Sequence, residues 1–288
     1  MSAKILDGKV VSESIKAKLK EEIEALSGQP GLAVILVGDN PASRVYVNHK
    51  KKVCAEIGIQ SFEFLIDPAE GEARLIEVLN ECNAREEVHG ILLQLPLPDG
   101  FDDEKMLEYI DSKKDVDGLH PMNIGKMLIG LDSYRSCTPY GVMELLKFYD
   151  IDPNGKHVVI MGRSNLVGKP LAAMMVQKEA GANATVTICH SRTENIENIC
   201  SQADILVAAI GIPEFVKANM VKEGAVVIDV GINRIDAPET EKGTKLVGDV
   251  DYNAVIDKVS AITPVPGGVG PMTIAILMMN TVKSFKER

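Results

Sequence analysis

Residues 156–170, K-H-V-V-I-M-G-R-S-N-L-V-G-K-P, constrain the fold more than any other stretch of the chain. They begin as a short apolar run with two valines, which is typical of a strand buried on both faces. The run breaks at Gly162, and Pro170 then fits the first turn of a helix, where its missing N–H leaves no bond unmade. A strand, a glycine turn and a helix N-terminus together present free backbone N–H groups and a positive dipole end to an anion. We interpret the stretch as the pyrophosphate-binding turn of a dinucleotide-binding unit.

Two sequence patterns that resemble this turn do not match it. A P-loop has four residues between its glycines and a Ser or Thr after the Lys, whereas here five residues intervene and Pro170 follows Lys169. The usual dinucleotide pattern G-x-G-x-x-G is also not met, because Ser164 takes the place of the second glycine. On this segment alone, an ordinary strand-to-helix turn of an α/β protein stays open.

The next strand expected along the chain bears on the choice of cofactor. In an NAD-binding unit the end of this strand carries an Asp or Glu that holds the ribose 2′-hydroxyl. Here the strand is followed by His190, Ser191 and Arg192, with no carboxylate among them. Arg163 in the turn, together with Ser191 and Arg192, offers guanidinium and hydroxyl donors suited to a 2′-phosphate, although Arg192 taken alone also fits a solvated loop. The sequence favours NADP over NAD.

Strands alternate with helices along the chain, which predicts an α/β protein with parallel sheets. We expect two α/β lobes with a cleft between them, the second a Rossmann-like dinucleotide-binding domain. Residues 1–120 and 270–288 form the first lobe, residues 138–265 form the second, and a helix near residues 138–149 joins them. The last helix, over residues 272–285, is apolar nearly all round, so we expect it to be buried against the first lobe. The expected strands cover residues 32–37, 61–66, 90–95, 157–161, 185–189, 204–210, 225–230 and 246–247.

Composition and charge limit the partners of the chain. A net charge of −10 with no basic tail argues against a nucleic acid or an anionic membrane surface. The five cysteines are odd in number and have no C-x-x-C spacing, as expected for reduced thiols in the cytoplasm. The start of the chain lacks the apolar core of a signal peptide, and no apolar run is long enough to span a bilayer. The sequence predicts a soluble cytoplasmic protein.

Residues that follow strands are the candidates for chemistry, because open α/β sheets bind ligands beyond the carboxyl ends of their strands. Tyr46 and Lys50 share one face of the helix after the first buried strand, and a lysine in a partly apolar cleft can act as acid or base. Lys50 also heads a run of three lysines, which is typical of a solvated face. Gln94 ends an apolar strand, and Asp117 shares a turn with Asp115, where either carboxylate fits a loop cap. No cluster has metal-ligand spacing, so we expect no metal.

Several motifs together resemble one known family over essentially the whole chain. They are Y-V-N-H-K at residues 46–50, G-I-L-L-Q-L-P-L-P at 90–98, K-D-V-D-G at 114–118, the turn at 162–170, and P-V-P-G-G-V-G-P-M-T at 264–273. The chain is thereby similar to the methylenetetrahydrofolate dehydrogenase/cyclohydrolase family. The resemblance implies NADP-dependent oxidation of 5,10-methylenetetrahydrofolate to the 5,10-methenyl form and hydrolysis of that form to 10-formyltetrahydrofolate. It also implies a homodimer, with the interface in the cofactor lobe.

The same resemblance implies roles for individual residues. Lys50 would be the acid or base of the hydrolysis, Gln94 would hydrogen-bond and tune it, and Tyr46 would stack on and orient the folate. Asp117 would hold the pterin edge. The residues implied to line the folate pocket are Pro266, Gly267, Gly268 and Val269, and those implied to lie near the cofactor are Gly162, Arg163, Ser164, Ser191, Arg192, Ile232 and Thr273.

The same residues leave two alternatives to this function. One is another two-lobed NADP-dependent oxidoreductase that acts on a small pterin or carbonyl substrate. The other is a non-catalytic NADP-binding regulatory protein, which is disfavoured because Tyr46, Lys50, Gln94 and Asp117 would all have to be idle. Binding of a folate, measured as protection against thermal unfolding, separates the first alternative from the folate enzyme.

Overall fold

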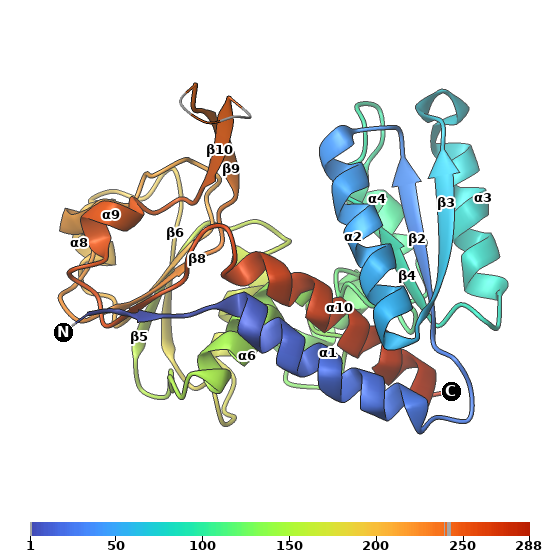
Figure 1. The fold of residues 1–288 in the computed structure, drawn as a ribbon, viewed down its shortest axis with the longest axis horizontal. Helices are drawn as coiled ribbons and strands as arrows, with labels where there is room; N and C mark the ends of the chain where they lie inside the picture. The colour runs from blue at the N-terminus through green and yellow to red at the C-terminus, as the bar shows by residue number, and fades with distance from the viewer. Residues whose placement is uncertain (1, 239, 241–242) are drawn as a thin grey trace. The chain divides into compact units, whose positions relative to one another are not determined.

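The structure is a computed structural model that describes residues 2–238, 240 and 243–288. The chain divides into two compact units, here called the six-stranded unit and the three-stranded unit after their main sheets. The six-stranded unit comprises the residues up to Ser12 and Thr138–Thr273, and the three-stranded unit comprises Glu13–Cys137 and Ile274–Arg288. Each unit combines a parallel sheet with helices (Figure 1), which confirms the predicted α/β class and the presence of two lobes.

The three-stranded unit is built on a fully buried central strand. The sheet has the order β3-β2-β4 with both pairs parallel, and every residue of β2 is buried, as expected for a strand covered on both faces. One face of the sheet packs on a cluster that includes Leu75, Leu79 and Met106 from the helices α3 and α4. The elements are β2 (Gly31–Val37), α2 (Pro41–Ile57), β3 (Gln60–Ile66), α3 (Gly71–Ala84), β4 (Gly90–Leu93), α4 (Asp103–Glu108) and α5 (Pro121–Leu128), with a 3₁₀ turn at Pro68–Glu70.

The six-stranded unit has the strand order β1-β11-β8-β7-β5-β6, with every pair parallel. The order places β5 between β6 on one side and β7 and β8 on the other. A separate antiparallel hairpin, β9 with β10, follows β8. The elements are β1 (Lys4–Ile5), β5 (His157–Met161), α7 (Gly168–Met175), β6 (Thr185–Cys189), α8 (Ile196–Cys200), β7 (Ile205–Ala208), β8 (Val226–Asp229), β9 (Asn233–Asp236), β10 (Thr244–Val247), α9 (Tyr252–Val255) and β11 (Ala261–Ile262), with a 3₁₀ turn at Ala218–Met220.

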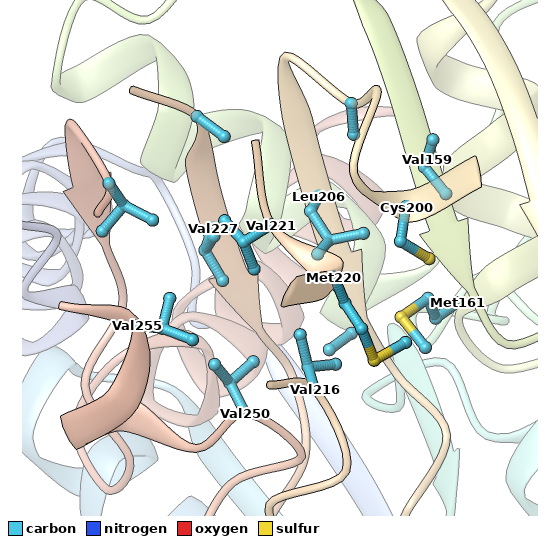
Figure 2. Close-up of a cluster of buried hydrophobic side chains, with 14 of the residues drawn as sticks. Val159, Met161, Cys200, Leu206, Val216, Met220, Val221, Val227, Val250 and Val255 are labelled. Atoms are coloured by element: carbon cyan, nitrogen blue, oxygen red, sulfur yellow. The ribbon is translucent and has the colours of Figure 1, made fainter. Parts of the chain in front are cut away.

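A cluster of buried aliphatic and sulfur-containing side chains covers one face of the six-stranded sheet (Figure 2). Val159, Leu206 and Val227 point from three neighbouring strands toward Met220 and Val255 of the segments that cover them. Because the strands contribute alternate residues to this cluster, the residues between them face the opposite side of the sheet. Val158 and Ile160, which alternate along β5 with Val159 and Met161 of the cluster, are also fully buried, so the sheet is covered on both faces.

Three helices cross the boundary between the two units in sequence: α1 (Gly8–Glu24), α6 (Cys137–Phe148) and α10 (Val269–Lys286). The last helix is buried as expected at Ile274 to Met278, and Ile274–Arg288 falls in the three-stranded unit. Residues 270–273, which were also assigned to the first lobe, fall in the six-stranded unit. This helix begins at Val269, three residues earlier than expected.

Two other expectations about the fold were wrong. Residues 1–12 were assigned to the first lobe, but they belong to the six-stranded unit, where β1 pairs with β11. A two-residue strand is too short to carry a hydrophobic pattern, so this pairing cannot be predicted from the sequence. The strand expected at residues 246–247 exists as the end of β10, but it pairs antiparallel with β9 and is not part of the parallel sheet.

Candidate functional site

Lys50 lies on α2 and points into the three-stranded unit, even though it is the first of three consecutive lysines, a pattern typical of a solvated face. It is only 7% exposed, whereas the neighbouring Lys51 is exposed and pairs with Glu63. The Lys50 Nζ donates a hydrogen bond of 2.8 Å to the Oε1 of Gln94, directly after β4. The Nε2 of Gln94 in turn donates to the carbonyl of Leu95 at 2.8 Å, which fixes the orientation of the amide. The structure thus brings together two of the predicted site residues from different elements.

Burial and a neighbouring charge act in opposite directions on the pKa of Lys50. Burial lowers the pKa of Lys50, because removing the ammonium from water penalises the charged state. The negative charge of Asp117 acts in the opposite direction. A lysine with a lowered pKa can take up a proton near neutral pH, which an ordinary surface lysine does poorly.

Tyr46 lies one helical turn before Lys50 and is 43% exposed. An aromatic ring that is half open to solvent beside a buried amine offers a flat surface on which a ring-shaped ligand can stack. The pair therefore combines a surface for binding with a group for proton transfer on one helix face.

The structure distinguishes the two aspartates of the turn between α4 and α5. Asp115 is buried and accepts hydrogen bonds from the backbone N–H of His120 at 2.8 Å and from the Nδ2 of Asn123 at 2.8 Å, so it holds the start of α5. Asp117 is half-buried, and its pKa is raised by burial, with the Lys50 ammonium acting in the opposite direction. Of the two aspartates, Asp117 is the one whose charge raises the pKa of Lys50, and its role in folate binding stays a prediction.

In the six-stranded unit, the predicted glycine turn follows β5 and leads to α7. A Cβ on Gly162, which has a φ of 122°, would lie 2.1 Å from the carbonyl oxygen of Ala209. A Cβ on Gly168 would lie 2.1 Å from the carbonyl oxygen of Gly162. Both positions require glycine, because real Cβ atoms do not approach other atoms so closely. The turn is therefore folded tightly against the start of α7, where the N–H groups of Lys169 and Leu171 already donate to the carbonyls of Ser164 and Val167.

The polar residues predicted to bind the cofactor lie in two places, the glycine turn after β5 and the loop after β6. Arg163 and Ser164 are exposed in the turn, and the Ser164 Oγ accepts a hydrogen bond of 3.1 Å from the N–H of Val167. Ser191 and Arg192 are exposed directly after β6, the strand next to β5. These side chains and the glycine turn share the carboxyl edge of one sheet, which is where an open α/β sheet binds a dinucleotide.

Comparison with known proteins identifies the family. The model of the catalytic domain of tetrahydrofolate dehydrogenase/cyclohydrolase matches residues 6–117, and the model of the NAD(P)-binding domain of the same family matches residues 136–288. The chain belongs to the tetrahydrofolate dehydrogenase/cyclohydrolase family. The first domain includes Tyr46, Lys50, Gln94 and Asp117, and the second includes the glycine turn.

Similar proteins match this family member over its full length. The bifunctional protein FolD of Acetivibrio thermocellus is 55% identical over 289 residues, covering 99% of this chain and 98% of the relative. The crystal structure of the bifunctional enzyme FolD from Campylobacter jejuni has a TM-score of 0.94 at 49% identity and covers 100% of both chains. The FolD structure from Trypanosoma brucei, complexed with NADP cofactor and inhibitor, has a TM-score of 0.93 at 36% identity, covering 100% of this chain and 98% of that one.

The remaining site residues implied by the family lie in the six-stranded unit. Gly267 and Gly268 form the loop before α10, and a Cβ on Gly8 would lie 1.7 Å from the carbonyl oxygen of Gly268, so this loop packs on the start of α1. Pro266 belongs to the same loop, and Val269 is the first residue of α10. The role of these four residues in folate binding stays a prediction.

Ile232 lies close to the start of α10, the helix that carries Thr273. The Thr273 hydroxyl hydrogen-bonds the hydroxyl of Thr138 at 2.9 Å. A Cβ built on Gly270 would lie 3.4 Å from the Cδ1 of Ile232, in ordinary contact. Ile232, after β8, therefore packs against the helix turn that carries Thr273.

Sequence reasoning missed two groups of residues that lie beside the candidate site residues. Cys54 and Cys137 face Lys50, and burial raises the pKa of Cys54 to about 12 and that of Cys137 well above its ordinary value, so both stay protonated. Asp229 and Asp249 are buried beside the loops after β7 and β8. A glycine stands next to Asp249 in sequence and two residues after Asp229, and this repeated pairing of Asp with Gly was the available signal.

Within the described residues, no group of three or more His, Cys, Asp and Glu side chains is arranged to hold a metal ion. No helix in the same part of the chain is long and apolar enough to cross a membrane.

Proposed function

We propose that the chain catalyses the NADP-dependent oxidation of 5,10-methylenetetrahydrofolate to 5,10-methenyltetrahydrofolate and the hydrolysis of that product to 10-formyltetrahydrofolate. The proposal rests on Lys50, which is buried, donates a hydrogen bond to Gln94 and has a lowered pKa. It stands in a chain of the tetrahydrofolate dehydrogenase/cyclohydrolase family. The full-length identity to FolD proteins disfavours an oxidoreductase with a different small substrate.

In the proposed assignment, the three-stranded unit binds the folate and the six-stranded unit binds NADP. Asp117 accepts hydrogen bonds from adjacent N–H donors of the pterin, and Tyr46 stacks on the folate. Pro266, Gly267, Gly268 and Val269 line the folate pocket. Gly162, Arg163 and Ser164 hold the pyrophosphate and the 2′-phosphate together with Ser191 and Arg192, while Ile232 and Thr273 lie near the nicotinamide.

The residues around the glycine turn fit NADP by two features of the structure. The turn is closed so tightly that no side chain fits at Gly162 or Gly168, and the side chains of Arg163 and Arg192 are exposed. The bound cofactor supplies the acceptor for the hydride that leaves the one-carbon bridge. The protein contributes binding and orientation, since hydride transfer requires the bridge to be held against the nicotinamide ring.

Hydrolysis uses the side chains of the three-stranded unit. The methenyl carbon is electrophilic, and a water molecule adds to it while neutral Lys50 takes one proton from that water. The bond from this carbon to N5 of the folate then breaks as N5 takes up the second water proton, which leaves a formyl group on N10. Gln94 holds the amine of Lys50 in place through its Oε1. One proton is released overall, and no metal takes part in this scheme.

Absorbance of the methenyl product, followed with NADP and then with NAD, tests the oxidation. We expect turnover with NADP and much less with NAD, because Arg163, Ser191 and Arg192 suit a 2′-phosphate. Absence of turnover with either nucleotide would contradict the dehydrogenase activity. Hydrolysis is tested separately by supplying the methenyl compound without a nucleotide.

We also propose that the protein is a cytoplasmic homodimer with its interface in the cofactor unit. The free, buried state of all five cysteines supports a reducing compartment. Among the described residues β6 has a sheet partner on one side only, and its Ile188 is 37% exposed, so this edge is suited to pairing with a second copy. Light scattering should give the mass of a dimer, and Ile188→Lys should shift it toward the monomer; a wild-type monomer would contradict the proposal.

A further inference from the structure

Two buried carboxylates connect the loops at the carboxyl edge of the six-stranded sheet. Asp249 is 0% exposed and Asp229 is 3% exposed. The Oδ2 of Asp249 accepts hydrogen bonds from the backbone N–H groups of Ile210 at 2.7 Å and Gly211 at 2.9 Å, directly after β7. Its Oδ1 accepts a third bond, of 2.9 Å, from the Nδ2 of Asn233, which follows the loop after β8. One side chain thus fixes two separate loops.

Asp229 fixes the segment that carries Asp249. Its Oδ1 accepts from the backbone N–H groups of Gly231 at 3.0 Å and Asp249 at 2.9 Å, and its Oδ2 accepts from that of Val250 at 2.9 Å. A Cβ on Gly248 would lie 1.8 Å from an oxygen of Asp229, and a Cβ on Gly231 would lie 2.2 Å from an oxygen of Asp249. The loops are therefore folded directly around the two carboxylates, with glycine where they come closest.

These loops lie on the side of the glycine turn that is opposite to β6. In the sheet order, β6 with Ser191 and Arg192 is on one side of β5, and β7 and β8 are on the other. The loop after β7 touches the turn, because a Cβ on Gly162 would meet the carbonyl oxygen of Ala209. If the turn holds the pyrophosphate and the β6 side holds the 2′-phosphate, the nicotinamide half extends over the loops after β7 and β8.

We propose that Asp249 is a positioning residue for the nicotinamide half of the cofactor. Its carboxylate holds Gly211 after β7 and, through Asn233, Ile232 after β8, so that both loops are already in place before the dinucleotide binds. This inference rests on the proposed function, since it requires that the edge of this sheet binds NADP. It predicts that Asp249 affects cofactor binding and hydride transfer while it leaves the hydrolysis at Lys50 unchanged.

Asp249→Ala, with Asp249→Asn as the conservative variant, tests the proposal. The Ala variant leaves the N–H groups of Ile210 and Gly211 without their acceptor, so we expect the Kd of NADP to rise at least about tenfold. It should also lower the dehydrogenase kcat at saturating NADP, since small misplacements are costly in hydride transfer. The Asn variant should restore most of the affinity, because its side-chain oxygen can still accept both N–H bonds. The side-chain amide of Asn233 can flip, so that its oxygen accepts from the new amide nitrogen.

Hydrogen exchange provides a readout that does not depend on activity. In the protein without ligand, the amides of Ile210 and Gly211 should be protected in wild type and in Asp249→Asn, and exchange faster in Asp249→Ala. Hydrolysis of the supplied methenyl compound, measured without nucleotide, should stay within about twofold of wild type in all variants, because the reacting groups lie in the other unit.

Asn233→Ala keeps the proposal testable if Asp249→Ala does not fold. It removes one hydrogen bond from a half-buried residue, and we expect a rise of about threefold to tenfold in the Kd of NADP with normal hydrolysis. The matched control is Asp251→Asn, two residues from Asp249, where the side chain caps α9 and pairs with Lys217; this variant should bind NADP as wild type does.

Two results separate failure of this inference from failure of the proposed function. If wild type binds NADP and both Asn233→Ala and a folded Asp249→Ala bind it equally well, Asp249 is not a positioning residue. Equal losses of oxidation and hydrolysis in Asn233→Ala would also overturn it, because they would indicate a general structural role. If wild type itself does not bind NADP, the assignment of the sheet edge is wrong.

Discussion

The two units prepare their sites by different physical means. The three-stranded unit buries one titratable side chain, Lys50, and controls it with a single amide, Gln94. The six-stranded unit instead shapes its backbone, with glycines at close approaches and two buried carboxylates that hold the loops. The first arrangement changes the reactivity of one group, and the second fixes the shape of the loops at the edge of the sheet. Substitutions in the two units should therefore affect different steps of the reaction.

Lys50→Met should produce the largest separation between the two activities. Without the amine, no group remains at this position to take the proton from water, so we expect hydrolysis of the methenyl compound to fall about a thousandfold. The Kd of NADP should not change. The matched control is Lys51→Met on the exposed side of the same helix, which should hydrolyse at the wild-type rate. Full hydrolysis by Lys50→Met would show that the role given to Lys50 is wrong.

Gly168→Ala should affect the other unit and leave hydrolysis intact. The new Cβ would lie 2.1 Å from the carbonyl oxygen of Gly162, so the turn must open and lose its fit to a pyrophosphate. We expect the Kd of NADP to rise about 30-fold, measured by calorimetry. Gly125→Ala is the control, because a Cβ there meets nothing within 4 Å and alanine favours the helix α5. Unchanged NADP affinity in Gly168→Ala would argue against a cofactor site at this turn.

Gln94→Glu should change the pH dependence of hydrolysis more than its maximum. A carboxylate in place of the amide favours the Lys50 ammonium, so the pKa of Lys50 should rise and the rate at pH 7 should fall about tenfold. The ascending limb of the pH–rate profile should move to higher pH. Gln94→Leu removes the acceptor without adding charge, and its profile should not move upward. The same upward shift in both variants would exclude charge as the cause.

Asp229 should give the six-stranded unit a modest dependence of stability on pH. Burial raises the pKa of Asp229 to about 7, so the folded state holds a proton that the unfolded chain has already lost above about pH 4. Its contribution to stability is fully present below that value and is lost as the pH rises through about 7. Between pH 6 and 8 the loss is about 1 kcal/mol.

The matched variant for this effect is Asp229→Asn, which cannot titrate. Its baseline stability should be lower, because one oxygen that accepts backbone N–H bonds becomes an amide nitrogen. The measurement is the free energy of opening from hydrogen exchange of the β7 and β8 amides at pH 6 and pH 8. Identical pH slopes in wild type and Asp229→Asn would contradict the assignment to this carboxyl.

The sequence was most informative where a local pattern determines the structure. The strands at residues 157–161 and 185–189 were predicted to the residue, because β-branched apolar runs end there at a glycine or at polar residues. The class of the fold followed from the alternation of strands and helices. Short elements without a hydrophobic pattern, such as β1 and β11, could not be found in this way.

The site was predictable only in part, because burial and pairing depend on segments distant in sequence. The sequence alone left Lys50 either in a cleft or on a solvated face, and the structure decides this through Gln94, 44 residues further along the chain. Asp115 and Asp117 are the same residue type two positions apart, and only the bonds of Asp115 to the start of α5 distinguish them. The role of Asp249 requires three loops to meet, which no local pattern indicates.

The most direct test of the division of labour is a paired measurement on Lys50→Met and Gly168→Ala. For each variant, cofactor-free hydrolysis of the methenyl compound and the Kd of NADP are determined on the same preparation. We predict reciprocal results: Lys50→Met binds NADP normally and does not hydrolyse, and Gly168→Ala hydrolyses normally and binds NADP weakly. Loss of both properties in either variant would contradict the assignment of the two tasks to separate units.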